Sequence, residues 1–195
     1  AKGCENIRLE GAYFYHTTGM AIGMSSCRNI YLNRVFLSPR EGMLMTATAD
    51  GLHCMNCTGD IVITGCVFEA SHDDCMNING RYLTVKSSEG NTLTLTGLDV
   101  PVFPGDVLEV YSKEDLHMVG SFTVTAVDAK TGILTVAEDT AGAVTDCFAA
   151  NITQSPTLTV RDCLMGNKRN RGMLIQVRNV TVENCTFRNI CHGPV

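Results

Sequence analysis

The sequence contains no tryptophan, and aromatic residues make up only 6% of its 195 residues. Charged residues are also sparse at 18%, whereas hydrophobic residues reach 45%, a balance that excludes an intrinsically disordered chain. Because aromatic side chains are so few, a buried core has to be filled by Val, Ile, Leu, Met and Cys.

Positive charge is in deficit as well. Fifteen Lys and Arg face twenty Asp and Glu, and the resulting net charge of −5 argues against a nucleic-acid partner bound through its phosphates. No apolar run approaches the roughly 18 residues that a membrane helix needs, so no membrane partner is expected. The first residues lack the apolar stretch of a signal peptide. Because any signal peptide would lie upstream of this sequence, we make no prediction of the localisation.

A short pattern repeats five times along the chain. An apolar-x-apolar pair, followed by polar residues and a second apolar cluster, has its first apolar residue at Ile7, Ile30, Ile61, Leu158 and Val180. The steps between these markers are 23, 31, 97 and 22 residues, so the long step holds one repeat and an insert of about 75 residues. A second strand-like element lies between the repeats, at residues 19–24, 50–55, 74–79 and 171–176.

Short strands that recur at this period predict an all-β chain folded as a right-handed parallel β-helix, a pectate-lyase-like solenoid whose coils stack about 4.8 Å apart. The insert instead alternates five strand-like segments with turns rich in Gly, Asn and Pro, which predicts a small antiparallel β-barrel or sandwich. We therefore expect β-helix coils in residues 1–80 and 154–195, the second set truncated, and an inserted antiparallel domain in residues 81–153.

Half of the ten cysteines occupy repeated positions, namely Cys4, Cys27, Cys66, Cys163 and Cys185. We interpret them as small, reduced side chains buried inside the solenoid. Neighbouring coils also place Cys163 and Cys185 within disulfide range, so these two could be bridged in an oxidising compartment. The Cys-x-x-Cys spacing suggests a zinc site as an alternative, built from His53, Cys54, Cys57, His72 and Cys75. No second Cys-x-x-Cys pair supports it, and no metal is expected.

Three aspartates fall at one edge of two neighbouring coils. Asp50 opens one strand-like element, and Asp73 and Asp74 open the equivalent one 23 and 24 residues later. His53 and Asn77 each follow an aspartate by three residues and should project beside each other. Paired carboxylates suit the general acid and general base of glycosidic cleavage. They could equally form turns, or hold calcium as in β-helical polysaccharide lyases.

The segment from Thr48 to Gly80, with its Asp-x-x-His and Asp-Asp-x-x-Asn motifs, resembles the active-site region of glycoside hydrolase family 110. Enzymes of that family are α-galactosidases that remove terminal α-1,3-linked galactose, including the blood-group B determinant. The resemblance continues in the insert at Pro104–Val110, which fits a β-barrel that the family inserts into its β-helix, and resumes at Asn170–Gln176.

This resemblance implies a carbohydrate substrate, an inverting mechanism and no cofactor. It implies Asp50, Asp73 and Asp74 as catalytic residues, and His53, Asn77 and Arg171 as residues that hold the sugar. The spacing alone does not support inversion, because equivalent positions about 4.8 Å apart are nearer the retaining separation of roughly 5 Å than the inverting 6.5 to 9.5 Å. The resemblance also implies a piece of a longer, exported enzyme, and we expect the piece to be weakly active or inactive.

Two other functions remain open at this point. One is a non-catalytic β-helix that binds glycans or serves as a structural stalk. The other is a calcium-dependent polysaccharide lyase, in which Arg169 or Arg171 would act as the base. Convergence of the three aspartates in a pocket favours the hydrolase, whereas their scatter over the surface favours the stalk.

Overall fold

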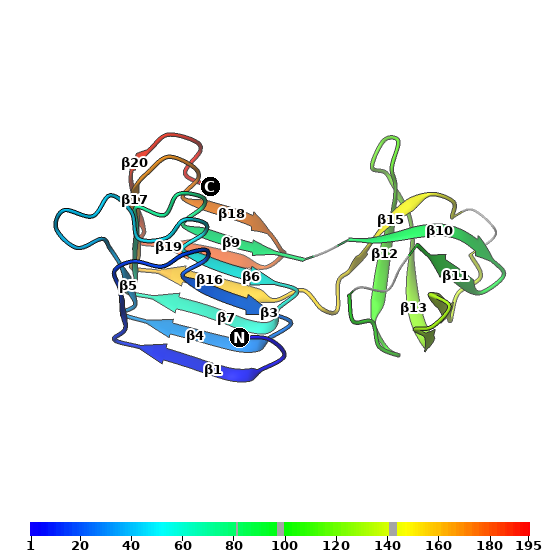
Figure 1. The fold of residues 1–195 in the computed structure, drawn as a ribbon. Helices are drawn as coiled ribbons and strands as arrows, with labels where there is room; N and C mark the ends of the chain where they lie inside the picture. The colour runs from blue at the N-terminus through cyan, green and yellow to red at the C-terminus, as the bar shows by residue number, and fades with distance from the viewer. Residues whose placement is uncertain (81, 97–99, 141–143) are drawn as a thin grey trace. The chain divides into compact units, whose positions relative to one another are not determined.

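The computed structural model describes residues 1–80, 82–96, 100–140 and 144–195. Within these residues the chain is all-β, with twenty strands and no helix, and its strands form three parallel sheets and one antiparallel barrel (Figure 1). Nothing in this part of the chain is a helix long and apolar enough to cross a membrane. The chain divides into two compact units, residues 1–80 with 155–195, and residues 81–154.

In the first unit the chain passes through three parallel sheets in turn. The first sheet contains β1 (Glu5–Glu10), β4 (Arg28–Asn33), β7 (Thr58–Thr64), β16 (Thr157–Arg161) and β19 (Val180–Glu183). The second contains β2 (Tyr13–Phe14), β5 (Phe36–Leu37), β8 (Val67–Glu69), β17 (Leu164–Lys168) and β20 (Thr186–Ile190). The third contains β3 (Ile22–Ser25), β6 (Leu52–Met55), β9 (Met76–Asn79) and β18 (Met173–Gln176).

We call one passage through these sheets a rung. Rungs 1 to 5 cover residues 5–25, 28–55, 58–79, 157–176 and 180–190. The five markers of the sequence repeat lie side by side in the first sheet, because Ile7, Ile30, Ile61, Leu158 and Val180 pair in that order. The prediction of an all-β chain with parallel sheets is thereby confirmed.

The core of the first unit lies between its three sheets. Strand β7 shows the alternation that builds it, since Ile61 and Ile63 are fully buried while Val62 between them is only half-buried. Aliphatic, Met and Cys side chains fill most of this core, and Phe68 is its fully buried aromatic residue. Burying each large apolar side chain stabilises the fold by roughly 1.5 to 3 kcal/mol.

Asparagines occupy the second residue of two strands of the first sheet, β1 and β4. Asn6 and Asn29 adopt left-handed backbone conformations with φ of 55°, which Asn tolerates better than most residues. Their side chains stack, and the Asn29 amide donates to Asn6 Oδ1 at 3.0 Å. Rung 3 has Gly59 here, with φ of 68°, and a Cβ on it would clash with Asn29 Oδ1. Both the backbone conformation and this contact therefore favour glycine beside the asparagine pair.

The second unit is a closed barrel of six antiparallel strands. In barrel order they are β10 (Leu83–Glu89), β11 (Thr92–Leu95), β14 (Ile133–Val136), β13 (Met118–Asp128), β12 (Val107–Ser112) and β15 (Cys147–Asn151). The sequence predicted five strands here and missed β15, whose Phe-Ala-Ala segment lacks β-branched residues. Strand β15 closes the barrel by pairing with both β10 and β12, so no strand edge is left open.

The burial of the cysteines predicts their reactivity. All ten thiols are free; Cys4 and Cys191 are exposed, Cys185 is intermediate, and the remaining seven are buried. Hydrogen bonding from Cys54 lowers the pKa of Cys57 to about 7, but its side chain is only 2% exposed. Because a thiol must be reached before it reacts, a disulfide reagent should modify Cys4 and Cys191 rapidly and the buried seven only on unfolding.

Time-resolved titration with Ellman's reagent measures this, and the double variant Cys4→Ser with Cys191→Ser should remove the rapid phase. All ten thiols should react in guanidinium chloride. Rapid reaction of the buried thiols in the native protein would contradict this prediction, because it would show that solvent reaches the cores that contain them.

Candidate active site

Acidic residues meet at the entrance to the third sheet. Leu52 of β6 pairs with Met76 of β9, so Asp50 and Asp74, two residues before them, occupy equivalent positions in rungs 2 and 3. Asp73 precedes Asp74, and one carboxylate oxygen from each of the three aspartates lies within 4.8 Å of the others. The structure therefore brings the three predicted carboxylates together. Nearest oxygens at this distance do not fix the separation of the carboxyl groups, which is what distinguishes retention from inversion.

Asp50 is buried, with 4% of its surface exposed, and both of its oxygens have partners. Its Oδ2 lies 2.6 Å from His53 Nδ1, and its Oδ1 accepts the backbone N–H of Asp74 at 3.0 Å. His53 lies opposite Asn77 in the parallel pairing of β6 and β9, as the sequence indicated. Asp50 thus ties rung 2 to rung 3 and orients the imidazole of His53.

Asp74 is more deeply buried, at 1% exposure, and contacts Arg171. The backbone N–H of Arg171 donates to Oδ1 at 3.3 Å and its Nη2 donates to Oδ2 at 3.4 Å. The Nε of Arg171 lies 3.2 Å from Oδ1, close enough for an ion pair but not aligned as a hydrogen bond. Arg171 lies just before β18 of rung 4, as Asp74 lies just before β9 of rung 3, because Met173 pairs with Met76. Its guanidinium offsets the buried negative charge.

Asp73 is the exposed member of the cluster. Its Oδ1 accepts a hydrogen bond from Asn170 Nδ2 at 2.6 Å, and its carboxylate remains accessible to solvent. Asn170 lies within the segment that carried the family resemblance but was not singled out as a site residue. An exposed carboxylate beside two buried ones offers a site where a water molecule or a sugar hydroxyl can reach the cluster.

Lys168 is a second residue that the sequence did not identify. It ends β17, is only 5% exposed, and its Nζ donates to Ser71 Oγ at 2.9 Å and to the carbonyl oxygen of Asp73. Burial lowers the pKa of Lys168, while the charges of Asp74 and Asp50 act in the opposite direction. Its partner in rung 5 is Ile190. A lysine at a repeat position where the next rung has an isoleucine is the signal that could have found it.

The same three carboxylates are the one group of three or more His, Cys, Asp or Glu residues close enough to hold a metal ion in the ranges that the structure describes. A divalent cation there would compete with the guanidinium of Arg171, which already neutralises Asp74. The zinc alternative around Cys54 and Cys57 gathers no such cluster among the described residues. Besides binding a cation, carboxylates in this arrangement can donate and accept protons.

Carboxylates that can serve as acid and base beside a solvent-accessible edge fit the chemistry of glycoside hydrolases. Sequence comparisons point to one kind of them. The chain is 29% identical to alpha-1,3-galactosidase A of Akkermansia muciniphila and 28% identical to that of Bacteroides fragilis, each over 94% of its length. It is 30% identical to alpha-1,3-galactosidase A of Streptomyces avermitilis over 88% of its length. No protein-family model matches the chain.

The resemblance drawn from the sequence is thus confirmed: the chain is homologous over most of its length to α-1,3-galactosidases of the glycoside hydrolase family 110 type. It spans about a third of the length of these curated relatives, 33% of the first two and 31% of the third.

The buried ammonium of Lys168 should leave a signature in the pH dependence of stability. Its folded pKa lies below the ordinary value of 10.5, so the unfolded state binds more protons in the range between the two values. The free energy of unfolding of the wild type, relative to Lys168→Met, should therefore rise as pH increases through that range.

Urea unfolding at a series of pH values up to 10.5 measures this difference. The exposed Lys86 supplies a matched control, because Lys86→Met removes a lysine that is not buried. Equal pH dependence in the wild type and Lys168→Met would contradict a buried, charged Lys168.

Proposed function

We propose that this chain carries the catalytic site of a glycoside hydrolase that removes terminal α-1,3-linked galactose from glycans, on a right-handed parallel β-helix interrupted by an inserted barrel. The observation that carries the proposal is the convergence of Asp50, Asp73 and Asp74 within 4.8 Å at one edge of the parallel sheets. The names of the relatives, alpha-1,3-galactosidase A and B, support this substrate class.

The proposed reaction is a single displacement at the anomeric carbon. One carboxylic acid protonates the glycosidic oxygen while the bond from this oxygen to C1 breaks, and another carboxylate takes a proton from the water that attacks C1. Attack from the opposite face inverts the anomeric centre, so an α-galactoside yields β-galactose. Inversion is proposed from the family resemblance, since nearest-oxygen distances allow either outcome.

The remaining side chains fall into two groups in this proposal. His53, Asn77 and Arg171 hold the hydroxyl groups of the sugar, and two of them also contact the carboxylates, His53 at Asp50 and Arg171 at Asp74. Lys168 and Asn170 position the exposed Asp73 through its carbonyl oxygen and its carboxylate. The reaction as proposed uses neither a metal nor an organic cofactor.

Replacing each aspartate in turn by asparagine tests the catalytic assignment. A general acid or base contributes roughly 10²- to 10⁴-fold, so Asp50→Asn, Asp73→Asn and Asp74→Asn, each made in the full-length protein, should lower kcat by about that factor. Stability should change little in Asp50→Asn, because the amide oxygen can still accept the N–H of Asp74. Kinetics on an aryl α-galactoside and on an α-1,3-linked disaccharide measure kcat, and proton NMR identifies the anomer released first.

The exposed Asp60 of β7 provides the matched control, and Asp60→Asn should leave kcat unchanged. If all three site variants keep more than about half of the wild-type kcat/KM, the aspartates only form turns, which asparagine does equally well. That result would favour a glycan-binding or structural protein. Loss of activity on chelation, with an unsaturated product, would instead indicate a calcium-dependent lyase.

Substitutions at the residues that hold the sugar should act differently. His53→Ala, Asn77→Ala and Arg171→Ala should raise KM more than they lower kcat, because contacts made equally in the ground and transition states are uniform binding. Steady-state kinetics on the same substrates separate the two parameters. Gln176 of β18 is exposed, and Gln176→Ala is the control that should change neither KM nor kcat. A fall in kcat as large as in the aspartate variants would show that these residues serve the carboxylates and not the sugar.

A further inference from the structure

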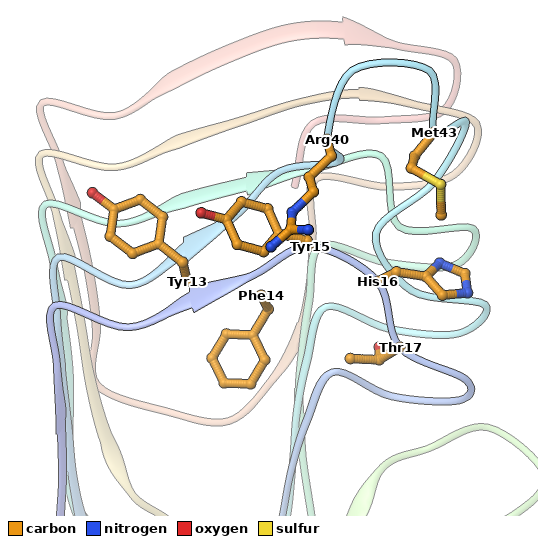
Figure 2. A pocket seen from close by; sticks show the side chains of 7 residues that line it. All are labelled: Tyr13, Phe14, Tyr15, His16, Thr17, Arg40 and Met43. Atoms are coloured by element: carbon orange, nitrogen blue, oxygen red, sulfur yellow. The ribbon is translucent and has the colours of Figure 1, made fainter.

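A pocket of about 400 Å³ lies on rungs 1 and 2, and none of the three carboxylates lines it (Figure 2). Its lining consists of Tyr13, Phe14, Tyr15, His16, Thr17, Arg40 and Met43. The volume falls within the range of about 300 to 1,000 Å³ that is typical of small-molecule sites. None of these residues has a part in the catalytic proposal above.

Two of the three Tyr and Phe rings of this pocket are exposed to solvent. Tyr13 is 60% exposed and Tyr15 is 40% exposed, and their ring centroids lie 6.2 Å apart at an interplanar angle of 20°. Phe36 of the next rung stacks on Tyr13 at 4.7 Å, and the Arg40 guanidinium lies 4.3 Å from the ring centroid of Tyr15. The stack is therefore an ordered platform that combines aromatic faces with hydroxyl and guanidinium donors.

This combination matches the chemistry of a sugar ring. A pyranose has faces of C–H groups that pack on aromatic rings, and an edge of hydroxyl groups that hydrogen-bond to phenol and guanidinium groups. Figure 2 shows Tyr13, Tyr15 and Arg40 together on one side of the chain, while Phe14 points the other way, toward the core. His16 also lines the pocket. Its Nδ1 lies 3.4 Å from the carbonyl oxygen of Met45, and its Nε2 is the ring nitrogen left to contact a ligand.

The pocket is linked to the carboxylates through one row of residues. Thr17 in the pocket forms a parallel bridge with Ala47, and Ala47 forms one with Ser71. Ser71 Oγ donates to the carbonyl oxygens of both Asp73 and Asp74. Two strand spacings, roughly 10 Å, thus separate the pocket from the segment that carries these aspartates. An oligosaccharide bridges such a distance, whereas a single galactose does not.

We propose that the pocket binds a sugar unit of the substrate glycan beyond the terminal galactose. The inference rests on the proposed function, because the galactose at the carboxylates sets the direction in which the rest of the glycan extends. Tyr13 and Tyr15 supply the stacking surface, and Arg40 supplies donors for hydroxyl groups. The pocket then selects among glycans that share the same terminal linkage.

The test compares two substrates in matched variants of the full-length protein. The ratio of kcat/KM for an α-1,3-galactosyl tetrasaccharide to that for an aryl α-galactoside should fall roughly tenfold in Tyr15→Ala, the change that about 1.4 kcal/mol of lost contact produces. Tyr15→Phe keeps the ring and should keep most of the ratio. Tyr82→Ala removes an exposed tyrosine of the second unit and should leave the ratio unchanged. An unchanged ratio in Tyr15→Ala would overturn the proposal.

Calorimetric binding of the tetrasaccharide to Asp73→Asn, with and without Tyr15→Ala, separates this proposal from the proposed function. Weaker binding in the double variant supports the pocket even if the wild type hydrolyses neither substrate, a result that would remove the hydrolase proposal alone. Equal binding in the two proteins shows that the pocket does not contact the glycan. Thermal unfolding of each variant confirms that the comparison is made between folded proteins.

Discussion

In-register parallel pairing of successive rungs is the constraint on which the first unit depends. Successive rungs are hydrogen-bonded to one another, so a residue at one repeat position is stacked on the same position one strand spacing away. This stacking gathers the buried Ile and Leu rows in the core. It also places Asp50, Asp74 and Arg171 at equivalent positions of rungs 2, 3 and 4. Core and candidate site are consequences of the same register.

Stacking like charges at this spacing requires compensation. Asp50 and Asp74 are nearly fully buried, and a buried carboxylate without a partner is strongly destabilising. For Asp50 the compensation comes from His53 and from the N–H of Asp74. For Asp74 it comes from rung 4, where Arg171 contacts the carboxylate. Rung 4 follows the inserted barrel in the chain, some 97 residues after its partners in rung 3. The return of the chain in register after the insert thus supplies the cation that partners the buried Asp74.

The polar and aromatic residues between the second and third sheets change from one rung to the next. Rung 1 has stacked tyrosines, rungs 2 and 3 have carboxylates, and rung 4 has Lys168, Asn170 and Arg171. Tyr13, Tyr15 and Asp73 are exposed, whereas Asp50, Asp74 and Lys168 are buried. A solenoid can vary its outward-facing residues without disturbing its core, because alternate residues of each strand face opposite sides of the sheet. An extended glycan lying across several rungs would meet these surfaces in order.

The sequence by itself determined the repeat period, the parallel stacking of the marker positions, the interrupting insert and the set of aspartates at one sheet edge. These follow from spacing, since residues offset equally from paired markers must lie side by side. Only the tertiary structure decided that Asp50 and Asp74 are buried while Asp73 is exposed, that β15 closes the barrel, and that Lys168 and Asn170 join the cluster. These features depend on side-chain direction and on contacts between residues about 97 positions apart, which no local pattern encodes.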